Sequence, residues 1–373
     1  MQGFLATFLI TIGLGQIISS SQGWRAASLV GPSRVAGYGL GLALLLSGAL
    51  ILPASWLDLG WTLPAGLLAL GVLVLGGSYI APSPHPDRLF SPDQPGHAGC
   101  QPVQIPDGEF LMPGFLLRPL PAAAQTGAAV CVIPGAGDYK TCFKWRLVEA
   151  LLAEGLTVLT IDPPGHGDYR YRPLVFPECL SALPAAVQFL RRQPGINRVG
   201  VAGISLGGAL AIRSVVEEAA RDQGNYGLVE ALAVLETPVS FNHSRALIYR
   251  EAWRTFRAPV LSLWREISVK QMIQSWKRGG CQSPHSTTEL FALLDPLENI
   301  RRIKQVPLLL VYSNRDPIAP PQTAQAMSQA APQAELLTST KASHVTLTLL
   351  PEINRQVARW LRQQLTRTGK PTN

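Results

Sequence analysis

A serine in a glycine-rich turn is the first residue of this sequence that could do chemistry. Ser205 follows the apolar run Arg198–Gly203 and precedes a helical pattern, within the sequence Gly203-Ile204-Ser205-Leu206-Gly207-Gly208. A hydroxyl is a weak nucleophile unless fixed geometry and a nearby base activate it. Small residues on both sides permit the sharp strand-to-helix turn that presents such a serine. The pattern therefore predicts Ser205 as a nucleophile.

A serine nucleophile needs a base, and histidine is the usual side chain for that role. The chain has 6 histidines, of which His344 lies shortly before the closing helical pattern Pro351–Leu365. A loop between a strand and a helix in this place belongs to the edge of the sheet where strands end. We therefore predict that His344 is the base.

The imidazole of such a base must be oriented by an acid. Asp316 comes just after the strand-like run Pro307–Ser313, and Pro317 restricts the loop that follows. We predict Asp316 as this acid. Glu236, which ends the run Ala231–Glu236, is the reserve candidate.

Acyl transfer also needs donors for the oxyanion of the transition state. The backbone amide directly after the nucleophile, that of Leu206, is the first predicted donor. The second is expected in the loop Pro134-Gly135-Ala136-Gly137, which follows the apolar run Ala128–Ile133. Ala136 is the predicted residue and Gly137 the next choice.

The elements that must position these residues alternate along the chain from about Gln101. After a predicted hairpin at Val103–Pro119, strands are expected at Ala128–Ile133, Leu156–Asp162, Arg198–Gly203, Ala231–Glu236 and Pro307–Ser313. Helices are expected at Phe143–Glu154, at Leu180–Arg192, from Leu206, and at Pro351–Leu365. Apolar strands that alternate with helices predict an α/β fold with a mostly parallel sheet flanked by helices. Ligands of such sheets bind at the carboxyl ends of the strands.

Charged residues are scarce, and the shortage is concentrated at the start of the chain. Lys and Arg number 32 against 24 Asp and Glu, and charged residues make up 15% of the 373 residues, against about 25% in an ordinary soluble domain. Residues 1–82 contain only three of them, Arg25, Arg34 and Asp58. A disordered chain is excluded by the hydrophobic content, and the 5 cysteines exclude a disulfide scaffold.

The N-terminal residues 1–82 are predicted to be a membrane domain. Three uncharged apolar runs, Gly3–Ser19, Ala36–Pro53 and Leu63–Ile80, approach the roughly 20 residues needed to cross a bilayer. We expect three transmembrane helices, with residues 83–100 as a linker. Because Arg25 and Arg34 lie in the first loop, the positive-inside rule places that loop and the C-terminal domain in the cytoplasm. Membrane lipids are therefore expected partners.

The C-terminal domain is predicted at residues 101–367, with a cap at about 237–305 and a tail at 368–373. The cap segment carries Trp253, Trp264 and Trp276 among basic residues that include Arg254, Arg257 and Lys277. Two interpretations stay open: a solvated helical cap whose tryptophans pack on the core, or a surface that faces anionic lipid and admits an acyl substrate. No nucleic-acid motif accompanies the basic balance, so no nucleic-acid partner is predicted.

Taken together, these motifs resemble the α/β-hydrolase superfamily, in its serine esterase, lipase and serine-peptidase-like branch. The resemblance rests on the order Ser205, Asp316, His344, on the two turns quoted above, and on Asp162-Pro163-Pro164-Gly165-His166-Gly167 after the strand Leu156–Asp162. Pro134-Gly135 stands where those branches commonly have His-Gly. The family assigns His166 to a structural turn.

The resemblance implies a Ser-His-Asp hydrolase that cleaves an ester, thioester or amide through an acyl-enzyme. Together with the three apolar runs, it predicts a membrane-anchored enzyme, with lipid-derived acyl compounds among its candidate substrates. No cofactor or metal is expected. Two alternatives stay open: an acyltransferase that uses the same three residues, and a non-catalytic hydrolase-like module that binds membrane partners. The oligomeric state and the natural substrate are not determined by the sequence.

Overall fold

The computed structural model describes most of the C-terminal part of the chain and portions of the N-terminal part. The described residues are 2–22, 34–51, 65–66, 68–72, 98–120, 125–141, 145–241 and 280–367, with 244, 246–247, 249–251 and 254. The chain divides into two compact units, one made of residues 1–85 and 259–277 and the other of residues 86–258 and 278–373. We describe each unit by itself.

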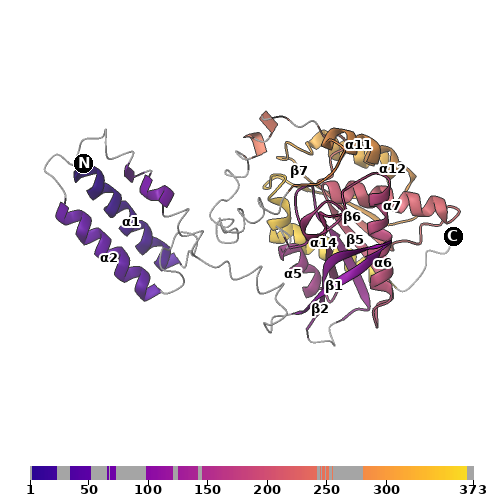
Figure 1. Cartoon of the computed structure of the whole chain (residues 1–373), viewed down its shortest axis with the longest axis horizontal. Helices are drawn as coiled ribbons and strands as arrows, with labels where there is room; N and C mark the ends of the chain where they lie inside the picture. The colour runs from indigo at the N-terminus through magenta and orange to yellow at the C-terminus, as the bar shows by residue number, and fades with distance from the viewer. Residues whose placement is uncertain are drawn as a thin grey trace. The chain divides into compact units, whose positions relative to one another are not determined.

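The first unit contains two helices that lie side by side, α1 (Gln2–Gln22) and α2 (Arg34–Ile51) (Figure 1). They pack closely because glycines face the partner helix: a Cβ on Gly41 would lie 2.9 Å from the carbonyl oxygen of Gly13. The buried positions include the small residue Ala6, the polar Gln16 and the apolar Ile12. Leucines occupy the exposed positions instead, so this unit presents apolar side chains outward.

The exposed leucines are frequent along both helices. Leu42, Leu46 and Leu50 are 55%, 57% and 87% exposed and form one stripe along α2, because they are four residues apart. Leu5 and Leu14 of α1 are also exposed. A soluble surface normally places charged residues on the outer face of a helix.

Within the described residues, none of the helices is both long and apolar enough to cross a membrane. The prediction of three transmembrane helices is therefore not supported. α1 and α2 overlap the first two predicted runs, whereas the third is described only at residues 65–66 and 68–72.

The second unit is built on an eight-stranded sheet with the order β1-β2-β4-β3-β5-β6-β7-β8. The strands are β1 (Ala98–Asp107), β2 (Phe110–Pro119), β3 (Ala128–Ile133), β4 (Thr157–Ile161), β5 (Arg198–Ile204), β6 (Ala231–Leu235), β7 (Leu308–Ser313) and β8 (Glu335–Ser339). β1 pairs antiparallel with β2, and β2 with β4, while all other pairs are parallel. The predicted mostly parallel sheet is confirmed.

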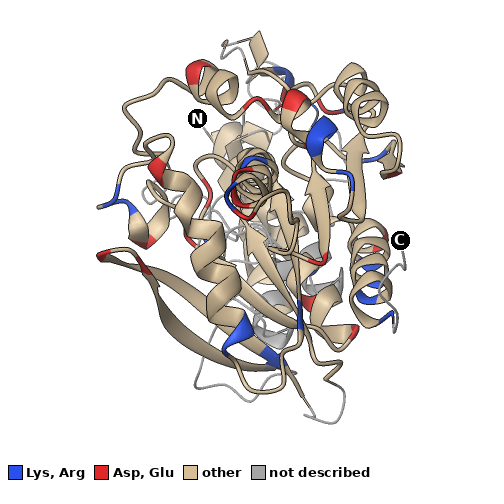
Figure 2. Cartoon of the chain, turned by 90° about the vertical axis from the view of Figure 1, so that its right-hand side faces the viewer, with Lys and Arg blue, Asp and Glu red and all other residues tan. Residues whose placement is uncertain are grey.

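Helices cover both faces of this sheet. On one face, α5 (Trp145–Ala153) packs against α14 (Pro351–Thr366), and on the other, α7 (Leu206–Arg221) contacts α6 (Ala182–Arg191), α11 (Thr287–Leu294) and α12 (Pro296–Arg302). α13 (Pro321–Ala330) packs against α12 and β7. Because both faces are covered, all residues of β3, β4, β6 and β7 are buried and uncharged. Figure 2 accordingly shows the charged residues mainly on helices, loops and strand ends.

The predicted elements differ from the observed ones mostly at their ends. β1 begins at Ala98, so the last three residues of the predicted linker belong to the sheet. The remainder of that linker lies outside the described residues, as does the tail 368–373. In the predicted cap segment, α11 and α12 pack against α7, whereas residues 255–279 are not described.

Candidate active site

Ser205 sits at the junction of β5 and α7 with a backbone that few residues adopt. Its φ and ψ are 51° and −117°, in the positive-φ region that side chains disfavour. Neighbouring glycines make the turn sterically possible: a Cβ on Gly207 would lie 2.4 Å from the carbonyl oxygen of Pro134, and one on Gly203 would lie 2.6 Å from the Cα of Gly208. The local sequence therefore folds into the strained turn that was predicted from it.

Asp316 lies in the loop that follows β7, and its carboxylate is fully buried. One oxygen, Oδ1, accepts the backbone N–H groups of Ile318 at 2.7 Å and Ala319 at 2.8 Å. The other, Oδ2, lies 2.6 Å from Nδ1 of His344. Burial prevents water from donating hydrogen bonds to this carboxylate, and these three partners donate to it instead. They therefore fix the direction in which the carboxylate faces.

His344 lies between Asp316 and Ser205. Its Nε2 is 3.0 Å from the Ser205 Oγ. A carboxylate can only accept a hydrogen bond, so Nδ1 carries the proton that is shared with Asp316. The Nε2 of the neutral ring is then free to accept the proton of the serine hydroxyl. The structure thus brings together the three residues that the sequence singled out from three separate loops.

Several charged groups act on the pKa of His344 in opposite directions. Burial lowers this pKa, because it disfavours the imidazolium ion. The carboxylates of Asp316, Glu251 and Asp138 raise it, and their combined effect is larger, so the pKa lies above the usual value of 6.5. The site therefore stabilises the imidazolium that forms when the base accepts a proton.

The loop after β3 packs directly against the serine turn. A Cβ on Gly135 would lie 3.2 Å from the Ser205 Cβ, so a side chain there would be tightly packed against the serine turn. The next residue, Ala136, is exposed and belongs to a turn closed by the Asp138 N–H, which donates to the Gly135 carbonyl oxygen at 3.2 Å. Leu206 is the first residue of α7, and the first N–H groups of a helix have no partner within it. Both predicted oxyanion donors are therefore near Ser205, and their role stays a prediction.

A buried ion pair supports this loop. Asp162, directly after β4, accepts the backbone N–H of Lys140 at 2.6 Å and its Nζ at 2.7 Å. The same carboxylate accepts the N–H of Asp168 at 2.9 Å. Because His166 is buried and its Nδ1 bonds the Pro164 carbonyl oxygen at 2.8 Å, the turn after β4 acts as structural support, as the resemblance implied.

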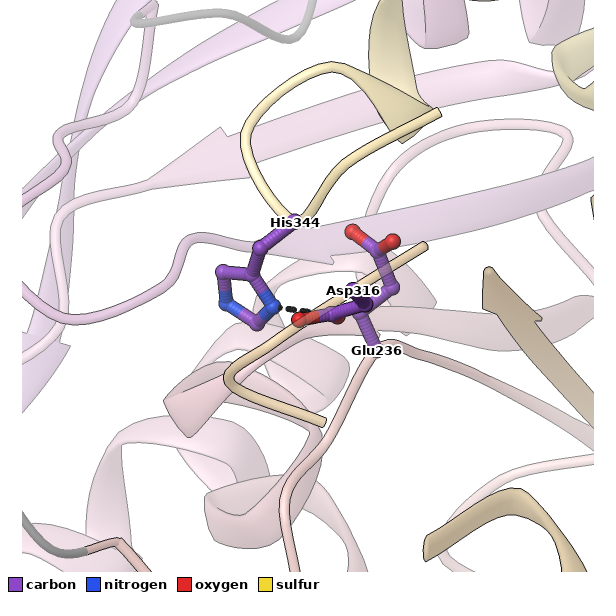
Figure 3. A group of neighbouring side chains, drawn as sticks. All are labelled: Glu236, Asp316 and His344. Atoms are coloured by element: carbon purple, nitrogen blue, oxygen red, sulfur yellow. Dashed lines mark hydrogen bonds and ion pairs between the residues drawn. The ribbon is translucent and has the colours of Figure 1, made fainter. Parts of the chain in front are cut away.

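Glu236, the reserve acid, lies next to Asp316 (Figure 3). Ligand atoms of Glu236, Asp316 and His344 lie within 4.8 Å of one another, but the dashed line joins only His344 and Asp316. Among the residues that the structure describes, neither carboxyl oxygen of Glu236 has a hydrogen-bond partner, although the residue is fully buried. Burial, followed by the charges of Asp316 and Glu251, holds its pKa well above the usual range. The site therefore favours the protonated form of Glu236.

A metal ion is the other group that such a spacing could hold. However, Asp316 Oδ2 and His344 Nδ1 already share a hydrogen bond of 2.6 Å. The proton of this bond lies between the two atoms that would have to bind the metal. The raised pKa of Glu236 also makes its carboxyl a poorer metal ligand. The arrangement fits a hydrogen-bonded acid and base better than a metal centre.

One residue at the site was missed by the sequence reasoning. Glu251, from the segment between β6 and β7, is 6% exposed. Its Oε1 accepts the Val345 N–H at 2.9 Å, and its Oε2 accepts the His344 N–H at 3.3 Å. Nothing in the sequence around Glu251 indicates a contact with a loop more than ninety residues away.

The cap residues predicted to face lipid are described only in part. Arg254 donates from Nη1 to the carbonyl oxygen of Arg315 at 2.5 Å. Arg257, Lys277 and the three tryptophans of the cap lie outside the described residues.

Comparison with known proteins identifies relatives of the sheet domain. A model of the alpha/beta hydrolase family matches residues 129–359, which is more than half of the chain. No protein of curated function matches the sequence.

Solved structures share the fold at low sequence identity. A bromoperoxidase from Bacillus anthracis superposes with a TM-score of 0.53 at 15% identity, covering 70% of this chain and 100% of its own. A thermophilic carboxylesterase cloned from a metagenomic library gives 0.51 at 17% identity and covers 75% and 94%. An esterase from Exiguobacterium antarcticum gives 0.50 at 15% identity and covers 70% and 100%. Each of these similarities concerns the fold.

Proposed function

Because the chain belongs to the alpha/beta hydrolase family, we propose that it is a serine hydrolase that cleaves an acyl bond through Ser205, His344 and Asp316. The observation that carries this proposal is the continuous hydrogen-bonded series from Ser205 Oγ to His344 Nε2 at 3.0 Å and from His344 Nδ1 to Asp316 Oδ2 at 2.6 Å. Each of these residues follows a strand end, where the sheet holds it in place.

The proposed reaction begins when His344 Nε2 accepts the Ser205 proton while Oγ attacks the acyl carbonyl carbon. The negative oxygen of the tetrahedral intermediate is bound by the amides of Leu206 and Ala136. The imidazolium, stabilised by Asp316, gives its proton to the leaving group as the bond to it breaks. Water then attacks the acyl-enzyme with His344 again as base, which releases the carboxylic acid and restores the Ser205 hydroxyl.

The proposed substrate is a small-molecule ester. Two of the proteins with this fold are an esterase and a carboxylesterase, and an ester needs less leaving-group protonation than an amide. Lipid-derived and thioester substrates fall within the same chemistry. The identity of the acyl group is best resolved by comparing esters of increasing chain length.

The test of this proposal is turnover of a soluble ester by the full chain and by Ser205→Ala. We expect the variant to lose at least about a thousandfold in kcat, because the remaining groups cannot form an acyl-enzyme. Ser214→Ala is the matched control, since Ser214 is a buried serine of the neighbouring helix α7 whose hydroxyl donates to the Leu180 carbonyl oxygen at 3.2 Å. Unchanged turnover in Ser205→Ala would refute the proposal.

We also propose that the first unit holds the enzyme at a membrane surface. The support is the outward placement of Leu42, Leu46 and Leu50, on helices that pack through small residues. Burying one leucine side chain in an apolar environment contributes about 2 kcal/mol. The cytoplasmic orientation expected from Arg25 and Arg34 forms part of this proposal.

A further inference from the structure

Two residues of one short segment contact both loops of the active site. Glu251 and Arg254 come from the stretch between β6 and β7, three residues apart. The Glu251 carboxylate accepts two backbone N–H groups of the loop that carries His344, at 2.9 and 3.3 Å. The Arg254 guanidinium donates at 2.5 Å to the carbonyl oxygen of Arg315, the residue before Asp316. The base and the acid are thus each held through the backbone next to them.

The contact with Glu251 determines how the His344 loop is folded. A turn closed by the Thr346 N–H, which donates to the Ser343 carbonyl oxygen at 3.2 Å, contains His344 and Val345. The N–H groups of these two central residues are directed at one carboxylate. Hydrogen bonds to an ionised acceptor are about twice as strong as neutral ones. A buried carboxylate in turn needs such donors, because an unsatisfied buried charge is costly.

The position of these loops matters because the His344 imidazole must hold two hydrogen bonds at the same time. Its Nδ1 must stay at Asp316 and its Nε2 at Ser205, with lengths of 2.6 and 3.0 Å. A displacement of about 1 Å from a remote change can cost on the order of a hundredfold in rate. Neither loop is part of a helix or strand at these residues, so its position depends on contacts of this kind.

We propose that Glu251 and Arg254 form a clamp, the Glu251–Arg254 clamp, that positions His344 and Asp316, so that the segment between β6 and β7 sets the competence of the active site. This inference rests on the proposed function. Both are positioning residues, since they act through the backbone of the loops.

The groups that face His344 make Glu251 measurable through pH as well as rate. Asp316 follows β7, Glu251 belongs to the clamp, Asp138 follows β3, and Glu236, whose pKa is raised by burial, follows β6. Removing the charge of Glu251 removes one of the influences that raise the pKa of His344. The acidic limb of kcat/KM should therefore move to lower pH in Glu251→Gln. A purely structural defect would reduce the amount of active enzyme and leave that limb in place.

The experiment compares the full chain with Glu251→Gln and Arg254→Gln, using Glu298→Gln as the matched control. Glu298 is an exposed glutamate of α12 that pairs with Arg301. We measure kcat/KM against pH with a soluble ester, and the labelling rate by a fluorophosphonate per titrated active site. Glu251→Gln is expected to lose at least about fivefold in both rates, and the acidic limb of its kcat/KM profile is expected to move to lower pH. Arg254→Gln, an exposed change that leaves the core intact, is expected to lose at least about threefold.

Two results would overturn the clamp. If Glu251→Gln has the same rates and the same acidic limb as the control, a positioning role for the Glu251 carboxylate is excluded. If Arg254→Gln has unchanged rates, a role for the contact with the Arg315 carbonyl oxygen is excluded. Failure of the proposed function is distinguishable, because the wild-type chain would then label no faster than Ser205→Ala. With wild-type labelling established, an unchanged clamp variant counts against the clamp alone.

Discussion

At the scale of single residues, the site is defined by which carboxyl groups have hydrogen-bond partners. Asp316 has two backbone donors and the His344 ring, whereas the neighbouring Glu236 has no hydrogen-bond partner among the described residues. Each arrangement has a consequence: the hydrogen bonds of Asp316 fix its direction toward the imidazole, and burial raises the pKa of Glu236. The sequence suggested both residues as acids, and this difference in donors explains the choice of Asp316.

The pH dependence of turnover follows from His344. The base must be neutral to accept the serine proton, and its pKa lies above the ordinary value because Asp316, Glu251 and Asp138 outweigh the effect of burial. We therefore expect kcat/KM to fall as the pH drops through a value above about 6.5. The acidic limb is measured as the initial rate of hydrolysis of a neutral, stable ester at pH values from about 5 to about 9. An acidic limb centred below 6.5 would contradict the assignment of these charges.

A second prediction concerns Glu236 and stability. Its pKa is raised in the folded state, so the carboxyl is neutral there and ionises on unfolding once the pH exceeds about 4.3. Unfolding then releases a proton, and the free energy of unfolding falls by about 1.4 kcal/mol per pH unit from about 4.3 up to the raised pKa. Glu236→Gln should lack this slope.

Differential scanning calorimetry of the wild-type chain and Glu236→Gln across that pH window checks the sign. The difference in melting temperature should change in favour of the variant as the pH rises. Parallel curves for the two proteins would mean that Glu236 is ionised in the folded state.

At the scale of elements, the sheet could be predicted because its central strands are short, apolar and separated by helical runs. β3, β5, β6 and β7 coincide with predicted strands to within one or two residues. The N-terminal start of β1 was missed because Ala98–Cys100 belongs to a polar, proline-rich stretch with no apolar alternation. Strand pairing, which depends on the partner, overrides such local composition.

The residues of the candidate active site could be predicted from the sequence, whereas the residues that hold their loops in place could not. Ser205, Asp316 and His344 each follow a recognisable element, and the carboxyl ends of parallel strands meet at one edge. Glu251 has no such signal, since its role arises from a fold contact between distant segments. The Asp162–Lys140 ion pair is of the same kind, because the motif gives the acid but not its partner.

Close packing of the serine turn gives a prediction for Gly207. A Cβ there would lie 2.4 Å from the Pro134 carbonyl oxygen and 2.5 Å from that of Ile133, both backbone atoms that cannot move separately. Gly207→Ala should destabilise the fold by about 1–3 kcal/mol and reduce ester turnover, because the loop with Ala136 must shift. Gly99→Ala, where a Cβ meets nothing within 4 Å, is the control. Chemical denaturation with parallel activity assays tests this, and equal behaviour of both variants would contradict the packing argument.

At the scale of the whole molecule, two units with different surfaces share one chain. Every described residue of the site belongs to the unit of residues 86–258 and 278–373, and charge is concentrated in this part of the sequence. The other unit exposes leucines and has few charged residues. We therefore propose that the reaction takes place in one unit and that the other unit contacts an apolar environment.

The membrane proposal predicts the behaviour of the full chain with vesicles. Exposed leucines should transfer into the acyl region, so the protein should float with phosphatidylcholine vesicles. A triple variant should reduce the bound fraction at least about tenfold, because about 2 kcal/mol is lost for each leucine removed. This variant combines Leu42→Ser, Leu46→Ser and Leu50→Ser. Leu336→Ser, an exposed leucine of β8, serves as the control. Equal flotation of the triple variant and the control would exclude this surface as the contact.

The central claim is that Ser205 is the nucleophile of an acyl-enzyme, and peptide-resolved mass spectrometry of the fluorophosphonate-treated full chain tests it most directly. The account predicts one adduct, on the peptide that contains Ser205, whose appearance runs parallel with the loss of ester turnover and is absent in Ser205→Ala. Complete loss of turnover with Ser205 unmodified, or an unmodified chain that still turns over ester, would contradict the account.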